Sequence, residues 1–136
     1  MYLTKNIYIS KDQRRKLKIS GGGGIRAGRV SEIIEDAGYW RKASAIHNWF
    51  VSNVQNGEDD CEEYYVDEEA LKKLLGLVKQ VLKNHDLAEE LLPAREGFFF
   101  GSTEYDEYYF DNLKATKKIL EAALKDGGYF HYQSSW

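Results

Sequence analysis

A single stretch, Gly38 to Cys61, limits most strongly what this chain can fold into. Its apolar residues recur at the three- and four-residue spacing of one buried helical face. They are Tyr39, Ala43, Ile46, Phe50 and Val54. Asn56-Gly57 is a typical helix end, because both residues tolerate the left-handed backbone conformation. The spacing therefore predicts an amphipathic helix that follows Ala37-Gly38 and ends near Asn56.

The residues before this helix predict strands. Tyr2 to Ser10 alternates partly between apolar and polar residues, and Lys16 to Ser20 alternates cleanly. With a polar turn between them, the two runs predict a β-hairpin. Gly21 to Gly24 interrupts the pattern, since four consecutive glycines cannot pack a core. Val30 to Asp36 fits a third strand or a short helical turn, and we favour the strand.

Two more main helices are expected after the central one. Asp67 is a good N-cap for the first, which should end near Asn84. Ser102 or Thr103 is expected to cap the second, which should end near Lys125. The remaining expectations are an extended segment at 64–66, a short helical turn at 87–92 and a last strand at 129–134. Together these elements predict an α+β fold, in which a small antiparallel sheet, made of the N-terminal hairpin and the C-terminal strand, packs with three main helices.

The length predicts a single domain over all 136 residues. Within it, residues 1–37 form a basic, β-rich part, and residues 38–136 form a mainly helical part that ends in a strand. No apolar run approaches the length needed to span a membrane, and the N-terminus lacks the apolar block of a signal peptide. The single cysteine cannot form an internal disulfide, which fits a reducing cytosol. We therefore expect a cytoplasmic protein with no membrane partner.

The net charge of −3 hides an asymmetry along the chain. Residues 1–42 carry ten Lys/Arg and four Asp/Glu, a net charge of +6, whereas residues 43–136 carry nine and eighteen, a net charge of −9. The cationic segment can neutralise the acidic one within the fold or across a homodimer, or it can present a positive surface to an anion. The chain as a whole is too acidic to favour non-specific binding to duplex DNA.

Several long strings within residues 38–136 carry a family resemblance. They are Tyr39-Trp40-Arg41-Lys42-Ala43, His47-Asn48-Trp49-Phe50-Val51, Asn53-Val54-Gln55-Asn56-Gly57, Asp59-Asp60-Cys61, residues 97–110 (GFFFGSTEYDEYYF) and Tyr132-Gln133-Ser134-Ser135-Trp136. In these strings the chain resembles a functionally uncharacterised family of small proteins from tailed phages and prophages. The resemblance implies a phage protein in the cytoplasm of a host cell, where such proteins act on host machinery, nucleotide pools or defences. It implies no catalytic residues.

A nucleotide-like ligand needs aromatic faces for a base, Arg or Lys for phosphates, and amides or hydroxyls for ribose. The central stretch offers all of these residue types. A helix start can also hold a phosphate through its free N–H groups, and carboxylates can accept hydrogen bonds from a ribose or a base. The predicted ligand-binding residues are therefore Trp40, Arg41, Lys42, His47, Asn48, Asp59, Asp60, Ser102, Thr103 and Tyr105.

Each of these residues also has a structural interpretation. A tryptophan such as Trp40 packs in a core more often than it stacks on a base, and His47 fits a hydrogen-bonded core histidine. Arg41 and Lys42 can pair with the acidic loop that follows the central helix. The glycine tract lacks the Gly-Lys-Ser/Thr of a phosphate-binding loop, and the cysteine and histidines lack the spacing of a zinc site. We therefore expect no cofactor and no metal.

Three functions remain open. The first is a non-catalytic binder that sequesters a small anionic ligand, such as a nucleotide-derived immune signal, in a deep pocket with arginine and aromatic walls. The second is an inhibitor of a host protein, whose acidic, tyrosine-rich surface lies over residues 105–111. The third is a small nucleotide hydrolase that uses His47 and Asp59 as an acid/base pair. We rank them in this order.

Overall fold

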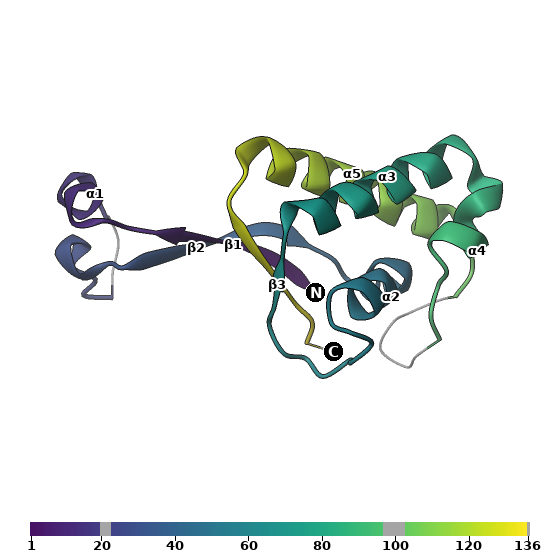
Figure 1. The fold of residues 1–136 in the computed structure, drawn as a ribbon, viewed down its shortest axis with the longest axis horizontal. Helices are drawn as coiled ribbons and strands as arrows, with labels where there is room; N and C mark the ends of the chain where they lie inside the picture. The colour runs from purple at the N-terminus through teal and green to yellow at the C-terminus, as the bar shows by residue number, and fades with distance from the viewer. Residues whose placement is uncertain (20–22, 97–102, 136) are drawn as a thin grey trace.

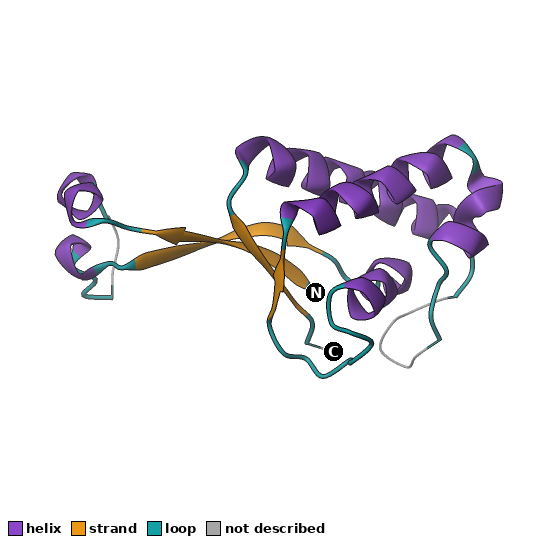
Figure 2. Cartoon of the chain, in the orientation of Figure 1, coloured by secondary structure: helices purple, strands orange, loops and turns teal. Residues whose placement is uncertain are grey.

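The computed structural model describes residues 1–19, 23–96 and 103–135. It shows an α+β fold with one four-stranded antiparallel sheet, in the strand order β2-β1-β4-β3 (Figures 1 and 2). The strands are β1 (Tyr2–Tyr8), β2 (Glu32–Tyr39), β3 (Tyr64–Val66) and β4 (Tyr129–Gln133). The helices are α1 (Lys11–Lys16), α2 (Ser44–Asn53), α3 (Glu68–Lys83), α4 (Ala88–Leu91) and α5 (Glu107–Asp126), with 3-10 turns η1 (Ala27–Arg29) and η2 (His85–Leu87).

The sheet is buried on one face only. Side chains alternate along each strand, so that Leu3, Phe130 and Tyr132 are at most 1% exposed, while Tyr2 and Tyr129 on the opposite face are 42% and 58% exposed. The buried face packs against the helices. Figure 1 shows α3 and α5 lying side by side over the sheet, with α2 near the two chain ends. The outer face, by contrast, is open to solvent over the described residues.

The predicted N-terminal hairpin is wrong in its second strand. Lys16 to Leu17 ends a short helix, and the strand that returns to β1 is β2, the weaker of the strand predictions. A capping box explains the difference, because Ser10 accepts from the Gln13 N–H at 3.2 Å while the Gln13 side chain accepts from the Ser10 N–H at 2.8 Å. The loop between β1 and β2 is therefore a helical tip.

The central helix is shorter than its apolar spacing predicts. It begins at Ser44, because Gly38 and Tyr39 still belong to β2 and pair with Leu3 and Tyr2. Gly38 is required there, since a Cβ at this position would lie 2.5 Å from the Ile119 Cγ2 of α5. The first residues of the predicted helix therefore belong to β2 instead.

The remaining predictions are largely confirmed. Asp67 caps α3 by accepting from the Ala70 N–H at 2.8 Å, and β4 returns to pair with β1 as expected. The cap of α5 was predicted wrongly at Ser102 or Thr103. Asp106 is the cap, and its carboxylate accepts from the Tyr109 N–H at 3.1 Å; Ser102 lies outside the described residues. In the part of the chain that the structure describes, no helix is both long enough and apolar enough to cross a membrane.

The far ends of β1 and β2, with α1 and η1 between them, project away from the rest of the molecule as an arm (Figure 1). We call residues 9–19 and 23–31 the arm tip. β4 pairs with β1 only from Tyr2 to Asn6, so the outer end of the arm is a two-stranded ribbon without a helix packed on it.

The position of the α5 cap gives a first prediction. Asp106→Ala should lower the free energy of unfolding by about 1 kcal/mol, because the first turn loses a side-chain acceptor. Thr103→Ala should leave it unchanged within about 0.5 kcal/mol, since Thr103 is exposed and precedes the helix. Urea unfolding of both variants measures the difference. A loss in the Thr103→Ala variant alone would place the cap at Thr103 instead.

Candidate functional site

The predicted residues His47 and Asp59 meet in a buried hydrogen-bonded chain. His47 lies on the inner side of α2 and is fully buried. Its Nδ1 lies 2.7 Å from the Tyr132 hydroxyl of β4, and its Nε2 lies 3.0 Å from Asp59 Oδ1. The second oxygen of Asp59 lies 3.6 Å from an Arg95 guanidinium nitrogen. The chain Tyr132–His47–Asp59–Arg95 therefore runs from the core to the surface.

The protonation of this chain follows from its burial. Desolvation lowers the pKa of His47, although the Asp59 carboxylate opposes the shift, so the ring is neutral near pH 7. Asp59 can only accept, which assigns the proton to Nε2 and leaves Nδ1 to accept from the Tyr132 hydroxyl. Burial raises the pKa of Tyr132, which keeps that hydroxyl protonated. Every polar atom of the two buried rings is thus satisfied.

The position of this chain favours a structural role over a chemical one. Neither His47 nor Tyr132 has exposed surface, so a bound substrate would not touch either ring. The hydrogen bonds from Tyr132 through His47 to Asp59 hold the acidic loop after α2 against the sheet. The structural interpretation of His47 therefore fits the geometry, although the predicted acid/base pair with Asp59 is formed.

Trp40 also lies in the core. It is 3% exposed, and its Nε1–H donates to the Thr116 Oγ1 at 2.8 Å. Arg41 and Lys42 follow it and are exposed. The Arg41 carbonyl accepts from the Tyr108 hydroxyl at 2.9 Å, and neither cation forms an ion pair with a described carboxylate.

Two of the other predicted residues, Asn48 and Tyr105, bond to the peptide group between Pro93 and Ala94. The Asn48 Nδ2 donates to the Pro93 carbonyl at 3.4 Å, and the Tyr105 hydroxyl accepts from the Ala94 N–H at 3.2 Å. Asp60 accepts from the Tyr64 hydroxyl at 2.6 Å, which lowers the pKa of the Asp60 carboxyl. Of the nine predicted residues that the structure describes, only His47 and Asp59 contact each other through their side chains in a hydrogen bond or ion pair that it records.

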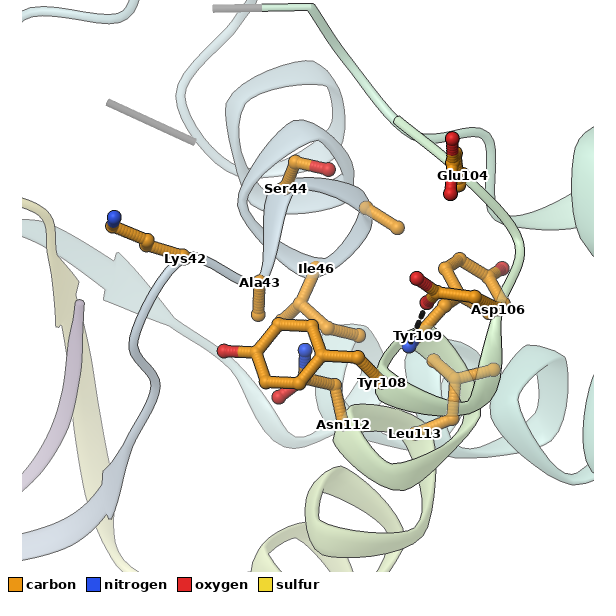
Figure 3. Close-up of a pocket in the computed structure, with 11 residues that line it drawn as sticks. Lys42, Ala43, Ser44, Ile46, Glu104, Asp106, Tyr108, Tyr109, Asn112 and Leu113 are labelled. Carbon is orange, nitrogen blue, oxygen red and sulfur yellow. Dashed lines mark hydrogen bonds between the residues drawn. The ribbon is translucent and has the colours of Figure 1, made fainter. Parts of the chain in front are cut away.

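A small cavity lies where the start of α2 faces the start of α5 (Figure 3). Its volume is about 20 Å³, room for about one water molecule. Lys42 lines it together with the carboxylates of Glu104 and Asp106, and the latter is engaged in its helix cap. The cavity is too small for a nucleotide, and two carboxylates oppose an anion there.

Three larger grooves meet at Trp49 and Asn53, with volumes of about 310, 290 and 160 Å³. Trp49 lines all three grooves and is 7% exposed. None of the three grooves combines an arginine with an open aromatic wall among the residues that line it. The deep pocket expected for a small nucleotide-like ligand is therefore absent from the cavities found among the described residues.

The arm tip is the strongest charged feature of the molecule. Residues 9–31 carry seven Lys/Arg and one Asp, a net charge of +6, and the rest of the chain carries −9. The cations are Lys11, Arg14, Arg15, Lys16, Lys18, Arg26 and Arg29. Over residues 1–19, 23–96 and 103–135, none of them is paired with a carboxylate. All but the half-buried Arg14 are exposed.

Sequence reasoning found the basic segment but missed its placement. The expected hairpin would have laid Lys16 to Ser20 along β1, within the sheet. The Ser10–Gln13 capping box was the available signal, since it predicts a helix start in place of the polar turn. With a helix at the tip, the cations gather at the end of the arm.

The outer face of the sheet is the second exposed feature. It presents the rings of Tyr2, Tyr8, Tyr39, Tyr65 and Tyr129, each at least 42% exposed. The 105–111 segment, expected to carry an acidic, tyrosine-rich surface, exposes Tyr105, Tyr108 and its carboxylates. Only Tyr109 of that predicted surface is buried, at 7% exposed, and its hydroxyl donates to the Leu92 carbonyl.

No protein-family model, no curated protein and no solved structure matches this chain. The resemblance to a phage family stays a prediction. Within the described segments, no three His, Cys, Asp or Glu side chains come together as a metal site. The exposed surfaces therefore carry the functional inference.

The buried His47 predicts a pH dependence of stability. Because its folded pKa is lowered, the unfolded chain binds a proton below about pH 6.5 that the folded chain does not bind. Stability from this group is complete above that pH and falls below it, by up to about 1.4 kcal/mol per pH unit. His47→Gln keeps a donor for Asp59 but cannot titrate.

The difference in unfolding free energy between the wild type and His47→Gln, measured by urea unfolding from pH 8 to 5, isolates the contribution of His47, because the two proteins are otherwise identical. At pH 8 the variant should be less stable by roughly 1–3 kcal/mol, since the Tyr132 hydroxyl loses its acceptor. The difference should shrink as the pH falls below about 6.5. A difference that stays constant would show that folding does not shift the pKa of His47, and a difference that grows would show that His47 is charged in the folded protein.

Proposed function

We propose that this chain is a non-catalytic binding protein, encoded by a phage, whose ligand is anionic and nucleotide-derived, and that it holds this ligand at the arm tip. The supporting observation is the gathering of seven cations without described ion-pair partners at the end of a projecting arm. Cations that stay unpaired in a chain with an excess of carboxylates favour the binding of an external anion.

The form of this surface favours a polymer over a small ligand. A small molecule needs a concave site that buries most of its surface, whereas the tip cations line none of the four cavities described above. A nucleic-acid backbone repeats its phosphates along its length, so it can contact several spread cations at once. Sequestration of a nucleic acid, in place of a small immune signal, is therefore the form of the proposal that fits the arm.

The separation of charge changes what the net charge means. A uniform protein of charge −3 would repel DNA, which is why the sequence argued against non-specific duplex binding. Here the +6 tip is held away from the −9 remainder, so an approaching polyanion is attracted to the tip and repelled from the body.

The absence of an accessible acid/base pair at the tip supports binding without turnover. The His47–Asp59 pair lies in the body, and the described tip residues include neither histidine nor cysteine and a single carboxylate, Asp12. The host-protein inhibitor remains the alternative, and it becomes the better account if no nucleic acid binds.

Charge reversal at the tip tests the proposal. Arg15→Glu, Lys18→Glu and Arg29→Glu together should weaken binding of a labelled oligonucleotide of about 20 nucleotides by roughly 100-fold or more, because three phosphate contacts are lost. The slope of log affinity against log salt should fall by about two to three. Fluorescence anisotropy from about 50 to about 200 mM salt gives both values.

The matched control reverses three exposed lysines of the body, Lys79, Lys114 and Lys118, and changes the net charge by the same amount. It should weaken binding only a few-fold, and the oligonucleotide should be recovered at full length. Equal losses for the two triple variants would mean that net charge matters and the tip does not. No binding by the wild type, or shortened oligonucleotide, would contradict the proposed function.

A further inference from the structure

A row of aromatic rings crosses the outer face of the sheet. The ring centres of Tyr8 and Tyr129 lie 6.2 Å apart, those of Tyr129 and Tyr65 lie 6.5 Å apart, and those of Tyr65 and His131 lie 5.8 Å apart. The rings come from β1, β4 and β3. Any two of these strands are more than fifty residues apart in the sequence. The pairing of these strands is what brings them together, with Asn6 opposite Tyr129 and Tyr65 opposite His131.

The tyrosines of this row are unusually open for rings on a sheet. Tyr8, Tyr129 and Tyr65 are 63%, 58% and 55% exposed. The opposite face of the same strands holds Phe130, Tyr132 and Val66 at no more than 1% exposed, so the alternation is complete. Apolar rings left in water at adjacent positions indicate a surface that a partner covers.

The row is continuous with the arm tip. Tyr8 is the last residue of β1, and Ser10, two residues on, caps the tip helix α1. After Tyr8 on β1, the next ring is Tyr129 on β4, and the last tyrosine is Tyr65 on the edge strand β3. A ligand held by the tip cations therefore meets Tyr8 first, and then Tyr129 and Tyr65.

The carboxylates of this face lie at its flanks. Glu32 and Asp36 are on the edge strand β2, opposite Tyr8 and Thr4 of β1, and Glu32 accepts a hydrogen bond from Asn6. Glu63 precedes the other edge strand β3, with its Oε1 3.9 Å from His131 Nε2. A duplex has phosphates on both of its outer sides, so laying it across this face would bring one backbone onto these carboxylates. A single strand can turn its bases to the rings and its phosphates away.

Building on the function proposed above, we propose that the Tyr8–Tyr129–Tyr65 row stacks the bases of a single-stranded nucleic acid whose phosphates bind the arm tip. Every base has a π-face, so stacking on aromatic side chains tolerates any sequence. The row explains the open tyrosines, and the tip explains the unpaired cations. The two together select single strands over duplexes, which charge alone does not do.

Removal of two rings separates stacking from charge. Tyr65→Thr with Tyr129→Thr keeps residues that favour strands but removes both rings. Affinity for a single strand of about 20 nucleotides should fall by about 30-fold, from the loss of two stacked bases. Affinity for the duplex of the same length should change by less than about two-fold, since its contacts are to phosphates. Tyr65→Phe with Tyr129→Phe keeps the rings and should bind the single strand like the wild type.

Each further result bears on one proposal or on both. An unchanged single-strand affinity in the threonine variant, with the tip variant still defective, overturns the stacking row and leaves the proposed function standing. Equal losses in the threonine and phenylalanine variants, at unchanged melting temperature, assign the effect to the hydroxyls and overturn it too. Failure of the wild type to bind either nucleic acid overturns both. Capture of a host protein that needs Tyr65 and Tyr129, without nucleic-acid binding, replaces the stacking row by a protein-docking face.

Discussion

Tyr132 is the side chain on which the arrangement of this fold depends. It is fully buried on the inner face of β4, and its ring stacks on Phe50 of α2 with the centres 3.9 Å apart and the planes 8° apart. Its hydroxyl donates to His47, one turn before Phe50 on the same helix. One residue thus combines burial of a large aromatic ring, worth roughly 1.5–3 kcal/mol, with a buried hydrogen bond that holds the neutral histidine in one tautomer.

This contact ties three parts of the chain together. The stack of Tyr132 on Phe50 fixes α2 on the sheet. The hydrogen bond from His47 to Asp59 then holds the acidic loop on α2. Breaking one partner would leave a buried polar group unsatisfied, which costs more than the hydrogen bond contributes. The acidic loop is therefore held on the body. Its carboxylates stay at a distance from the cations of the arm.

One-sided burial of the sheet explains the two exposed surfaces. Helices α2, α3 and α5 cover the inner face, while the outer face keeps its tyrosines in water. Because β1 and β2 are longer than β4 and β3, the ribbon continues beyond the covered part and becomes the arm. The same difference in strand length places Tyr8 at the junction of the arm tip and the sheet face.

Local sequence rules determined much of this protein. The cap at Asp67, the apolar stripe of α3 and the return of the last strand to the sheet follow from residues a few positions apart. The basic front and acidic remainder could also be read directly from the sequence. The start of α2 was predicted too early in the chain. Periodicity does not show that Gly38 and Tyr39 pair with β1, or that Gly38 lies against α5.

Only the tertiary structure decided which surfaces these residues form. His47 meets Tyr132 across 85 residues of sequence, and the ring row joins Tyr8, Tyr65 and Tyr129 from three strands. The sequence by itself determined which helices and charges exist, because capping and periodicity act within a turn or two of chain. Strand pairing acts between segments far apart in the sequence, so the burial of the histidine, the open face and the projecting basic tip arise only when the sheet forms.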